Sequence, residues 1–151
     1  MGRAAKAMLV IIGLVGVLML IGLAVVVYLV TRDGGAFMKD QQRVVNEGRQ
    51  YGTTASDSAC LVEAQKRLKA EAGFGGGLKS VVFLQHCVKP ARKSDAYCEG
   101  VPMPLEMIDS AAYQQKQCDD AGLGNNPFCP SLYSEVQQEC YRRWLDKKFE
   151  E

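Results

Sequence analysis

Residues 8–30 read MLVIIGLVGVLMLIGLAVVVYLV, and this stretch decides the organisation of the chain. It contains no charged residue and no Asn, Gln or Pro. As an α-helix it would rise roughly 34 Å, enough to cross a bilayer core of roughly 30 Å with some tilt. Charges stand on both sides, with Arg3 and Lys6 before the stretch and Arg32 and Asp33 after it. The sequence therefore predicts a transmembrane helix that contacts the lipid bilayer through residues 8–30.

A cleaved signal peptide is the main alternative for this stretch, because signal peptides also begin with basic residues. Their apolar region is about 7–15 residues long, and the run here is longer. The small residues Gly22 and Ala24 are followed by VVVYLV, which is a poor start for a mature protein. Myristoylation at Gly2 is disfavoured because Lys6 stands where Ser or Thr is expected. We therefore predict an uncleaved anchor.

All six cysteines follow the apolar stretch, at Cys60, Cys87, Cys98, Cys118, Cys129 and Cys140. An even number of cysteines in a short chain with an export-type segment predicts disulfide bonds and an oxidising compartment. The basic residues do not decide the orientation, because two precede residues 8–30 and three lie in the nearest outer flank. The cysteines therefore set the orientation, with the N-terminus in the cytoplasm and the Cys-rich part outside the cytosol.

The predicted chain is mainly α and has four parts. They are a cytoplasmic tail at 1–7, the transmembrane helix at 8–30, a juxtamembrane stalk or helix at 31–53, and a Cys-rich helical extracytoplasmic domain at 54–151. Gly34 and Gly35 are expected to separate the transmembrane helix from the juxtamembrane segment. In style the chain resembles Cys-rich, membrane-anchored proteins of bacteria, which implies an inner-membrane protein with a periplasmic domain. A eukaryotic endomembrane protein with a lumenal domain is the alternative.

About four helices are expected after residue 53. The first should span 57–72, because Leu61, Ala64 and Leu68 recur at helical spacing. Ser56, Asp57 and Ser58 are its candidate N-caps. The Gly-rich run at 73–77 is expected to form the turn after it.

Residues 78–89 are apolar on more than one side, which suits either a buried helix or a strand. Their length and helical surroundings favour a helix that stops before Pro90. Pro102 and Pro104 are expected to open a third helix. The predicted apolar side of this third helix consists of Leu105, Ile108, Ala111 and Ala112.

The last helix is expected at about 130–148. Its apolar stripe has a spacing of four residues and consists of Leu132, Val136, Cys140 and Trp144, widened by Tyr133, Tyr141, Leu145 and Phe149. The charged residues from Glu139 to Arg143 are predicted to form part of its solvent-facing side. Tyr141, Trp144 and Phe149 are candidates for contacting a partner protein, because aromatic residues dominate interface energies, and core packing is their alternative role.

Six cysteines allow 15 connectivities, and the sequence alone does not choose among them. Residues equally distant from the turn of a helical hairpin face each other, which favours two of the pairs. Cys60 and Cys87 flank the Gly-rich run at 73–77, and Cys118 and Cys129 flank the loop at 119–127. Cys98 would then pair with Cys140. The paired-cysteine hairpins of the mitochondrial intermembrane space do not match, since they place nine residues between cysteines and this chain places ten.

The sequence contains no recognisable catalytic motif. It has no C-x-x-C pair, no close Cys or His pair for zinc and no haem-attachment motif, and His86 is the sole histidine. A net charge of +1 argues against nucleic acid as a partner. We therefore expect no cofactor, no bound metal and no enzymatic activity.

Two classes of function remain after these exclusions. The first is a structural or protein-binding module whose partner is another envelope or membrane protein. The second is a thiol-redox factor or an enzyme that uses one of the cysteines. An accessory subunit of a larger membrane complex is a third reading. The sequence does not name the partner, the pathway or the oligomeric state.

Overall fold

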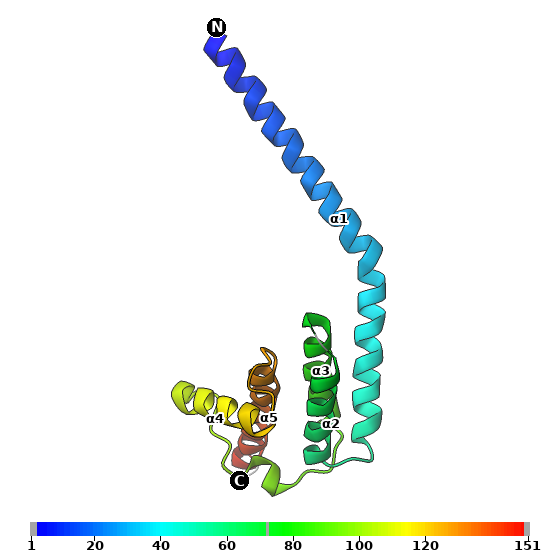
Figure 1. Cartoon of the computed structure of the whole chain (residues 1–151), viewed down its shortest axis with the longest axis vertical. Helices are drawn as coiled ribbons and strands as arrows, with labels where there is room; N and C mark the ends of the chain where they lie inside the picture. The colour runs from blue at the N-terminus through cyan, green and yellow to red at the C-terminus, as the bar shows by residue number, and fades with distance from the viewer. Residues whose placement is uncertain (1–2, 72, 150–151) are drawn as a thin grey trace. The chain divides into compact units, whose positions relative to one another are not determined.

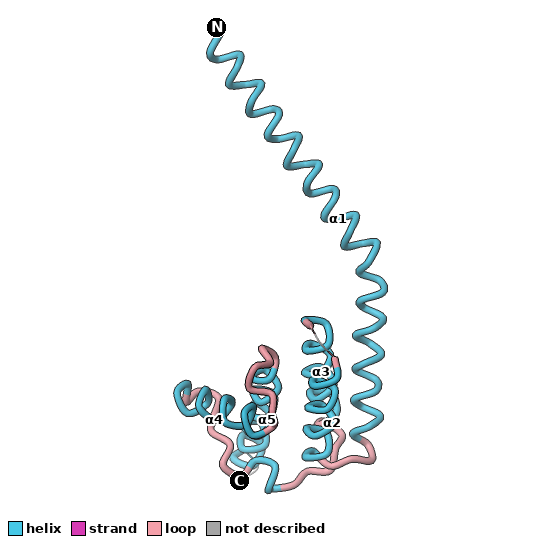
Figure 2. The backbone as a smooth tube through the Cα atoms, in the orientation of Figure 1, coloured by secondary structure: helices cyan, strands magenta, loops and turns pink. Residues whose placement is uncertain are grey.

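The computed structural model describes residues 3–71 and 73–149 of the chain. In chain order the helices are α1 (Arg3–Gly52), α2 (Asp57–Ala70), α3 (Phe74–Cys87), the 3₁₀ helix η1 (Asp95–Cys98), α4 (Met107–Asp120) and α5 (Cys129–Phe149). Figure 2 shows them joined by loops, with no strand in the described ranges. The prediction of a mainly α chain with about four α-helices after residue 53 is confirmed.

The chain divides into two compact units, Met1–Asp40 and Gln41–Glu151. The first unit consists of most of α1, whose side chains at 15–25, 27 and 28 are exposed. The side chains at 3–14, 26 and 29–37 lie outside the described part of the structure, so the span predicted at 8–30 is described only in part. Among the residues that the structure describes, no helix is both long enough and apolar enough to cross a membrane.

Helix α1 passes through Gly34 and Gly35 without interruption, so the predicted break at these residues is wrong. Glycine costs a helix only about 1 kcal/mol relative to Ala. Helix formation is cooperative, and a helix already formed on both sides of two glycines continues through them. The sequence left two alternatives for residues 31–53, a stalk or a helix. These residues belong to α1 as far as Gly52, and the second unit, which begins at Gln41, includes the last turns of this helix.

The end of α1 lies directly on the backbone of α3. Val44, Gly48 and Gly52 are buried there. A Cβ atom at Gly48 would come within 2.7 Å of the Phe83 carbonyl oxygen, and one at Gly52 within 2.2 Å of the Cys87 carbonyl oxygen. Two glycines four residues apart therefore permit a helix contact that any side chain would block.

Helices α2 and α3 lie side by side (Figure 1). Ser56 is the N-cap of α2, and its hydroxyl accepts a hydrogen bond from the Ala59 amide at 3.2 Å. Residues 78–87 are helical, so the helix alternative for 78–89 is correct. The buried side chains of the two helices include Ala64, Leu68, Phe83 and Leu84, and they form much of the core.

The Gly-rich run is mostly the first turn of α3 and not the predicted interhelical turn. Gly73, with φ of 94°, precedes the helix, which begins at Phe74. A Cβ atom at Gly77 would fall 2.1 Å from Cδ2 of Phe128, and one at Gly76 would fall close to Glu71. Gly76 and Gly77 thus allow close packing. The sequence alone does not distinguish glycines that allow close packing from glycines that form a turn.

The apolar side predicted for the third helix, which is α4, is exposed. The exposed residues are Leu105 (80%), Met107 (75%) and Ile108 (86%), together with Ala111 and Ala112. The side of α4 that packs on α5 combines Tyr113 and Cys118 with polar side chains. Gln114 Nε2 donates to Gln137 Oε1 at 2.7 Å, and Gln137 Nε2 donates to Ser110 Oγ at 3.0 Å. Because buried amides and hydroxyls satisfy each other here, the packed side did not need to be wholly apolar.

Three disulfides connect the helices of the second unit. They join Cys60 to Cys87, Cys98 to Cys140 and Cys118 to Cys129. The hairpin argument favours the first and the third of these pairs, and Cys98–Cys140 is the pair that then remains. They tie α2 to α3, η1 to α5, and the end of α4 to the start of α5. All six cysteines are paired, so the second unit carries no thiol.

Candidate binding groove

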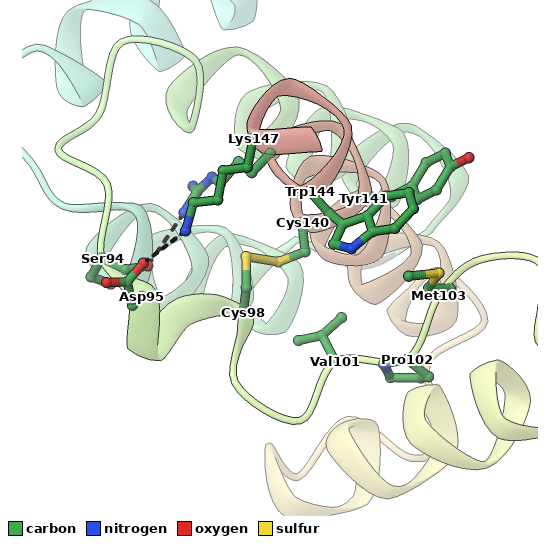
Figure 3. Close-up of a pocket in the computed structure, with 11 residues that line it drawn as sticks. Ser94, Asp95, Cys98, Val101, Pro102, Met103, Cys140, Tyr141, Trp144 and Lys147 are labelled. Atoms are coloured by element: carbon green, nitrogen blue, oxygen red, sulfur yellow. Dashed lines mark hydrogen bonds and ion pairs between the residues drawn. A yellow bond between two sulfur atoms is a disulfide. The ribbon is translucent and has the colours of Figure 1, made fainter. Parts of the chain in front are cut away.

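A groove of about 270 Å³ lies beside the Cys98–Cys140 disulfide (Figure 3). Val101, Pro102 and Met103 line it from the connector between η1 and α4. Residues of the second half of α5 line it opposite them, and Arg143 and Lys147 add positive charge. We call this cavity the α5 groove. Its walls combine apolar side chains with two cations.

Two aromatic side chains of α5 line the groove in contact with each other. The rings of Tyr141 and Trp144 stack with centroids 5.9 Å apart and planes 15° apart. The Lys148 ammonium lies 4.8 Å from the centre of the Trp144 ring. Residues three and four apart share one side of a helix, which explains this arrangement. Trp144 is 41% exposed, so a large apolar surface is held in a fixed position and remains accessible.

The three predicted partner-facing residues separate into two groups. Tyr141 and Trp144 lie together in the α5 groove, whereas Phe149 is 81% exposed and is not part of the groove wall. Phe149 is therefore an exposed aromatic residue of the same helix that can serve as a comparison for Trp144.

Hydrogen bonds hold the connector that forms the opposite wall. Gln137 Nε2 donates to the Pro102 carbonyl at 3.3 Å, and Ser110 Oγ donates to the Met103 carbonyl at 3.0 Å. The Gln137 side chain is buried and comes from α5 itself. The apolar connector residues are therefore fixed in place relative to α5, which preforms the groove.

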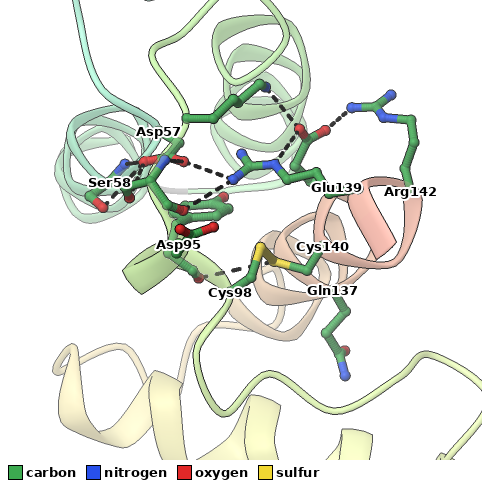
Figure 4. The surroundings of a disulfide bond; sticks show 12 residues. Asp57, Ser58, Asp95, Cys98, Gln137, Glu139, Cys140 and Arg142 are labelled. Carbon is green, nitrogen blue, oxygen red and sulfur yellow. Dashed lines mark hydrogen bonds and ion pairs between the residues drawn. A yellow bond between two sulfur atoms is a disulfide. The ribbon is translucent and has the colours of Figure 1, made fainter. Parts of the chain in front are cut away.

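A group of buried charges that includes Asp57 and Glu139 lies near the Cys98–Cys140 disulfide (Figure 4). Arg143 belongs both to this group and to the groove. Its Nη1 atom lies 3.0 Å from Asp57 Oδ2, and its Nε atom lies 3.0 Å from Glu139 Oε1. Lys93 Nζ lies 2.8 Å from the same Glu139 oxygen. We call Asp57, Lys93, Ser94, Glu139 and Arg143 the Asp57 cluster. It connects the start of α2 to α5 across the connector before η1.

The Asp57 cluster corrects the prediction that Glu139 to Arg143 form a solvent-facing charged side of α5. Glu139 is 4% exposed, and the side chain of Arg143 is 17% exposed. Arg142 also contacts Glu139, from the more exposed flank. These charges are buried because each has an oppositely charged partner inside the unit, which offsets the cost of removing them from water.

Hydrogen bonds keep Asp57 ionised despite its complete burial. Its carboxylate accepts hydrogen bonds from the Ser94 amide and hydroxyl, both at 2.9 Å, and from the Ser58 amide at 2.8 Å. Burial alone would raise the pKa of Asp57, but the hydrogen bonds from Ser94, Arg143 and Ser58 outweigh it and hold that pKa below its ordinary value.

Burial has the opposite effect on Lys93 and lowers its pKa. The positive charges of the nearby Arg143 and Arg142 lower this pKa further. Burial also raises the pKa of Tyr97, whose ring lies 5.1 Å from the Arg143 guanidinium. Tyr97 therefore remains protonated and packs η1 onto α5.

No protein-family model, curated protein or solved structure matches this chain. Within residues 3–71 and 73–149, no three His, Cys, Asp or Glu side chains gather in a way that could hold a metal ion. The sole histidine, His86, lies on α3 and does not line the groove; burial, with Lys89 and Arg49, lowers its pKa.

Sequence reasoning missed the connector wall and the Asp57 cluster. The inward position of Arg143 could have been predicted, because Arg143 follows the inward-facing Cys140 by three residues and so lies on the same side of α5. The contacts of Asp57 and Ser94 with Arg143 could not have been predicted, because each joins residues more than 45 positions apart in the chain. The groove itself can take up an apolar side chain next to a negative charge.

Proposed function

We propose that this chain is a single-pass, membrane-anchored extracytoplasmic protein whose helical unit is a protein-binding module. The α5 groove is its binding site, and the partner is another envelope or membrane protein. The observation that carries the proposal is the exposed Tyr141–Trp144 stack in a preformed groove. Large aromatic residues held in one conformation are the usual anchors of protein interfaces, because they bury much area at little entropic cost.

The amino-acid sequence supports the membrane part of the proposal. Residues 8–30 are uncharged and long enough to span a bilayer as a helix. The three disulfides support an oxidising compartment. An anchored module would meet its partner at the membrane surface, where both are confined and their effective concentration is raised.

The charges around the groove suggest what the partner presents. Lys147 is exposed at the groove, and Lys148 covers the Trp144 ring. Asp95, 3.5 Å from Lys147, is the carboxylate that faces it from η1. We propose that the partner segment inserts an apolar side chain between Trp144 and the connector and places acidic residues near the two lysines.

Replacing Trp144 with Ala should abolish the interaction, whereas Phe149→Ala should leave it intact. We expect the dissociation constant for the partner to rise about 30- to 1,000-fold for Trp144→Ala, as for a central aromatic anchor. The partner is first identified by cross-linking and co-purification of the wild-type chain from detergent-solubilised membranes. The dissociation constant of the purified partner is then measured for each variant and divided by the wild-type value.

The two variants are compared at equal stability, established by thermal unfolding. Equal loss of binding in both variants, or full binding by Trp144→Ala, would contradict the groove as the binding site. An alkaline carbonate wash before solubilisation tests the anchor separately. The chain should stay in the membrane pellet, and its release into the wash would contradict the membrane part of the proposal.

A further inference from the structure

The three disulfides differ in their accessibility to another thiol. Four cysteines are at most 1% exposed, namely Cys60, Cys87, Cys118 and Cys129. Cys98 and Cys140 are half-buried instead, and both line the α5 groove (Figure 3). A thiol that enters this groove therefore reaches the Cys98–Cys140 bond without any unfolding, whereas the other two bonds are shielded by the core.

Positive charge lies next to this accessible bond. Arg143 and Lys147 follow Cys140 on α5 and line the same groove. Asp57 and Glu139 neutralise much of the Arg143 charge, and the fully exposed Asp95 pairs with Lys147. Because both partners of the Asp95–Lys147 pair are largely exposed, water screens this pair, and the Lys147 ammonium can still interact with a thiolate that forms in the groove. A nearby cation stabilises a thiolate, which makes a cysteine a better leaving group in disulfide exchange.

The two halves of the bond are held in place by contacts other than the bond itself. Before Cys98, the Ser94 amide and hydroxyl both donate to Asp57 at 2.9 Å. After Cys98, the Pro102 carbonyl accepts from Gln137 of α5 at 3.3 Å. When the bond is open, these contacts keep Cys98 near Cys140. The pair can therefore close again without a search through the unfolded chain.

We propose that Cys98–Cys140 is a site of thiol–disulfide exchange with an external dithiol, which takes the chain beyond a purely structural use of its disulfides. The thiolate of the dithiol attacks one sulfur of the pair, the Cys98–Cys140 bond breaks, and a mixed disulfide forms while the other cysteine leaves as a thiolate. The second thiol of the dithiol attacks the mixed disulfide and releases the first cysteine. The dithiol loses two electrons and becomes a disulfide, and Cys98 and Cys140 gain these two electrons. The two protons that the dithiol releases protonate the thiolates of Cys98 and Cys140.

The order of reduction of the native chain tests this proposal. The full chain in detergent is treated with limiting dithiothreitol, quenched with N-ethylmaleimide at set times, digested and analysed by mass spectrometry. We expect Cys98 and Cys140 to be labelled at least about 100 times faster than the other four cysteines. The two disulfides in the core are reduced only in molecules whose core has opened, and such molecules make up about one in a thousand or fewer. The two shielded disulfides are the internal controls.

Simultaneous labelling of all six cysteines, or earlier labelling of another pair, would overturn the proposal. Circular dichroism of the selectively reduced chain checks that it stays folded, and unfolding at this step would also overturn it. Replacing the reductant with oxidised dithiothreitol, which accepts the two electrons, should restore the same pair. The outcome does not depend on whether the groove binds a protein, so it can fail while the binding proposal stands.

Lys147→Glu tests the electrostatic step, and Lys116→Glu on α4 is its matched control. Both lysines are more than 70% exposed in their side chains, but only Lys147 lines the groove. We expect Lys147→Glu to slow reduction of Cys98–Cys140 about 2- to 5-fold and Lys116→Glu to leave its rate unchanged. An equal rate in all three proteins would remove Lys147 from the mechanism.

Discussion

Replacing Asp57 with Asn is expected to lower the free energy of unfolding by about 3 kcal/mol, because it breaks a buried ion pair. Asn has almost the same volume, so packing is preserved. Its uncharged amide leaves Arg143 with only one buried carboxylate, Glu139. It also replaces one of the two oxygens that accept hydrogen bonds from Ser94 and Ser58. Urea unfolding followed by circular dichroism measures the difference.

Asp109→Asn is the matched control for this substitution. Asp109 lies exposed in the first turn of α4, where its charge is favourable to the helix dipole. We expect it to change the free energy of unfolding by no more than about 0.5 kcal/mol. A loss below about 1 kcal/mol for Asp57→Asn would show that the Asp57 cluster contributes little to stability.

The same carboxylate gives a pH dependence with a definite sign. Burial would raise the pKa of Asp57, but the hydrogen bonds from Ser94, Arg143 and Ser58 lower it further, so its folded value lies below its unfolded value. The stability that Asp57 contributes is then fully present above the unfolded pKa, about 3.9. It disappears as the pH falls through the lower folded value. The difference between wild type and Asp57→Asn should therefore be largest at neutral pH and shrink below about pH 4.

Replacing both Cys60 and Cys87 with Ala should lower the free energy of unfolding by about 5.5 kcal/mol. Loop closure over the 27-residue separation accounts for about 3.5 kcal/mol. The loss of two fully buried sulfur atoms adds about 1 kcal/mol each through lost packing. A domain of this size is stable by about 5–15 kcal/mol, so the double variant should lose at least about a third of its stability. Thermal unfolding without reductant measures the change.

The Cys98→Ala/Cys140→Ala double variant is the comparison. It opens a longer loop, with a separation of 42 residues, but it removes no fully buried sulfur, and the flanking contacts of Ser94 and Pro102 restrain the connector. We expect it to remain folded at 37 °C. A Cys60→Ala/Cys87→Ala protein as stable as wild type would contradict the role assigned to this bond in the core.

Local patterns in the sequence predicted the helices well. The stripe of Leu61, Ala64 and Leu68 and the Ser56 cap lie within α2 or at its start, and the last helix differs from its predicted limits by one residue at each end. The hairpin argument also favoured two of the disulfides present, and the third followed as the remaining pair. These features depend on short-range spacing, which is why a single sequence is enough to predict them.

The features that the sequence did not reveal depend on which partner each side chain meets. The apolar residues Leu105 and Ile108 are exposed, and the contacts of α4 with α5 include Gln114 and Ser110, whose partner is Gln137. Glu139 was expected on the surface, but its cationic partners bring it inside. No periodicity predicts such pairings, because they form between residues far apart in the chain. The aromatic pair Tyr141–Trp144 was singled out, whereas the connector wall opposite it was not.

Mass spectrometry of the native chain tests the central claim most directly, namely that an anchored helical unit is held together by disulfides in an oxidising compartment. The chain is extracted from its membranes with a thiol-blocking reagent and without reductant. We predict that residues 8–30 are retained and that Cys60–Cys87 and Cys118–Cys129 are fully bonded. Blocked thiols at these four cysteines, or a mature chain that begins after residue 30, would contradict the account.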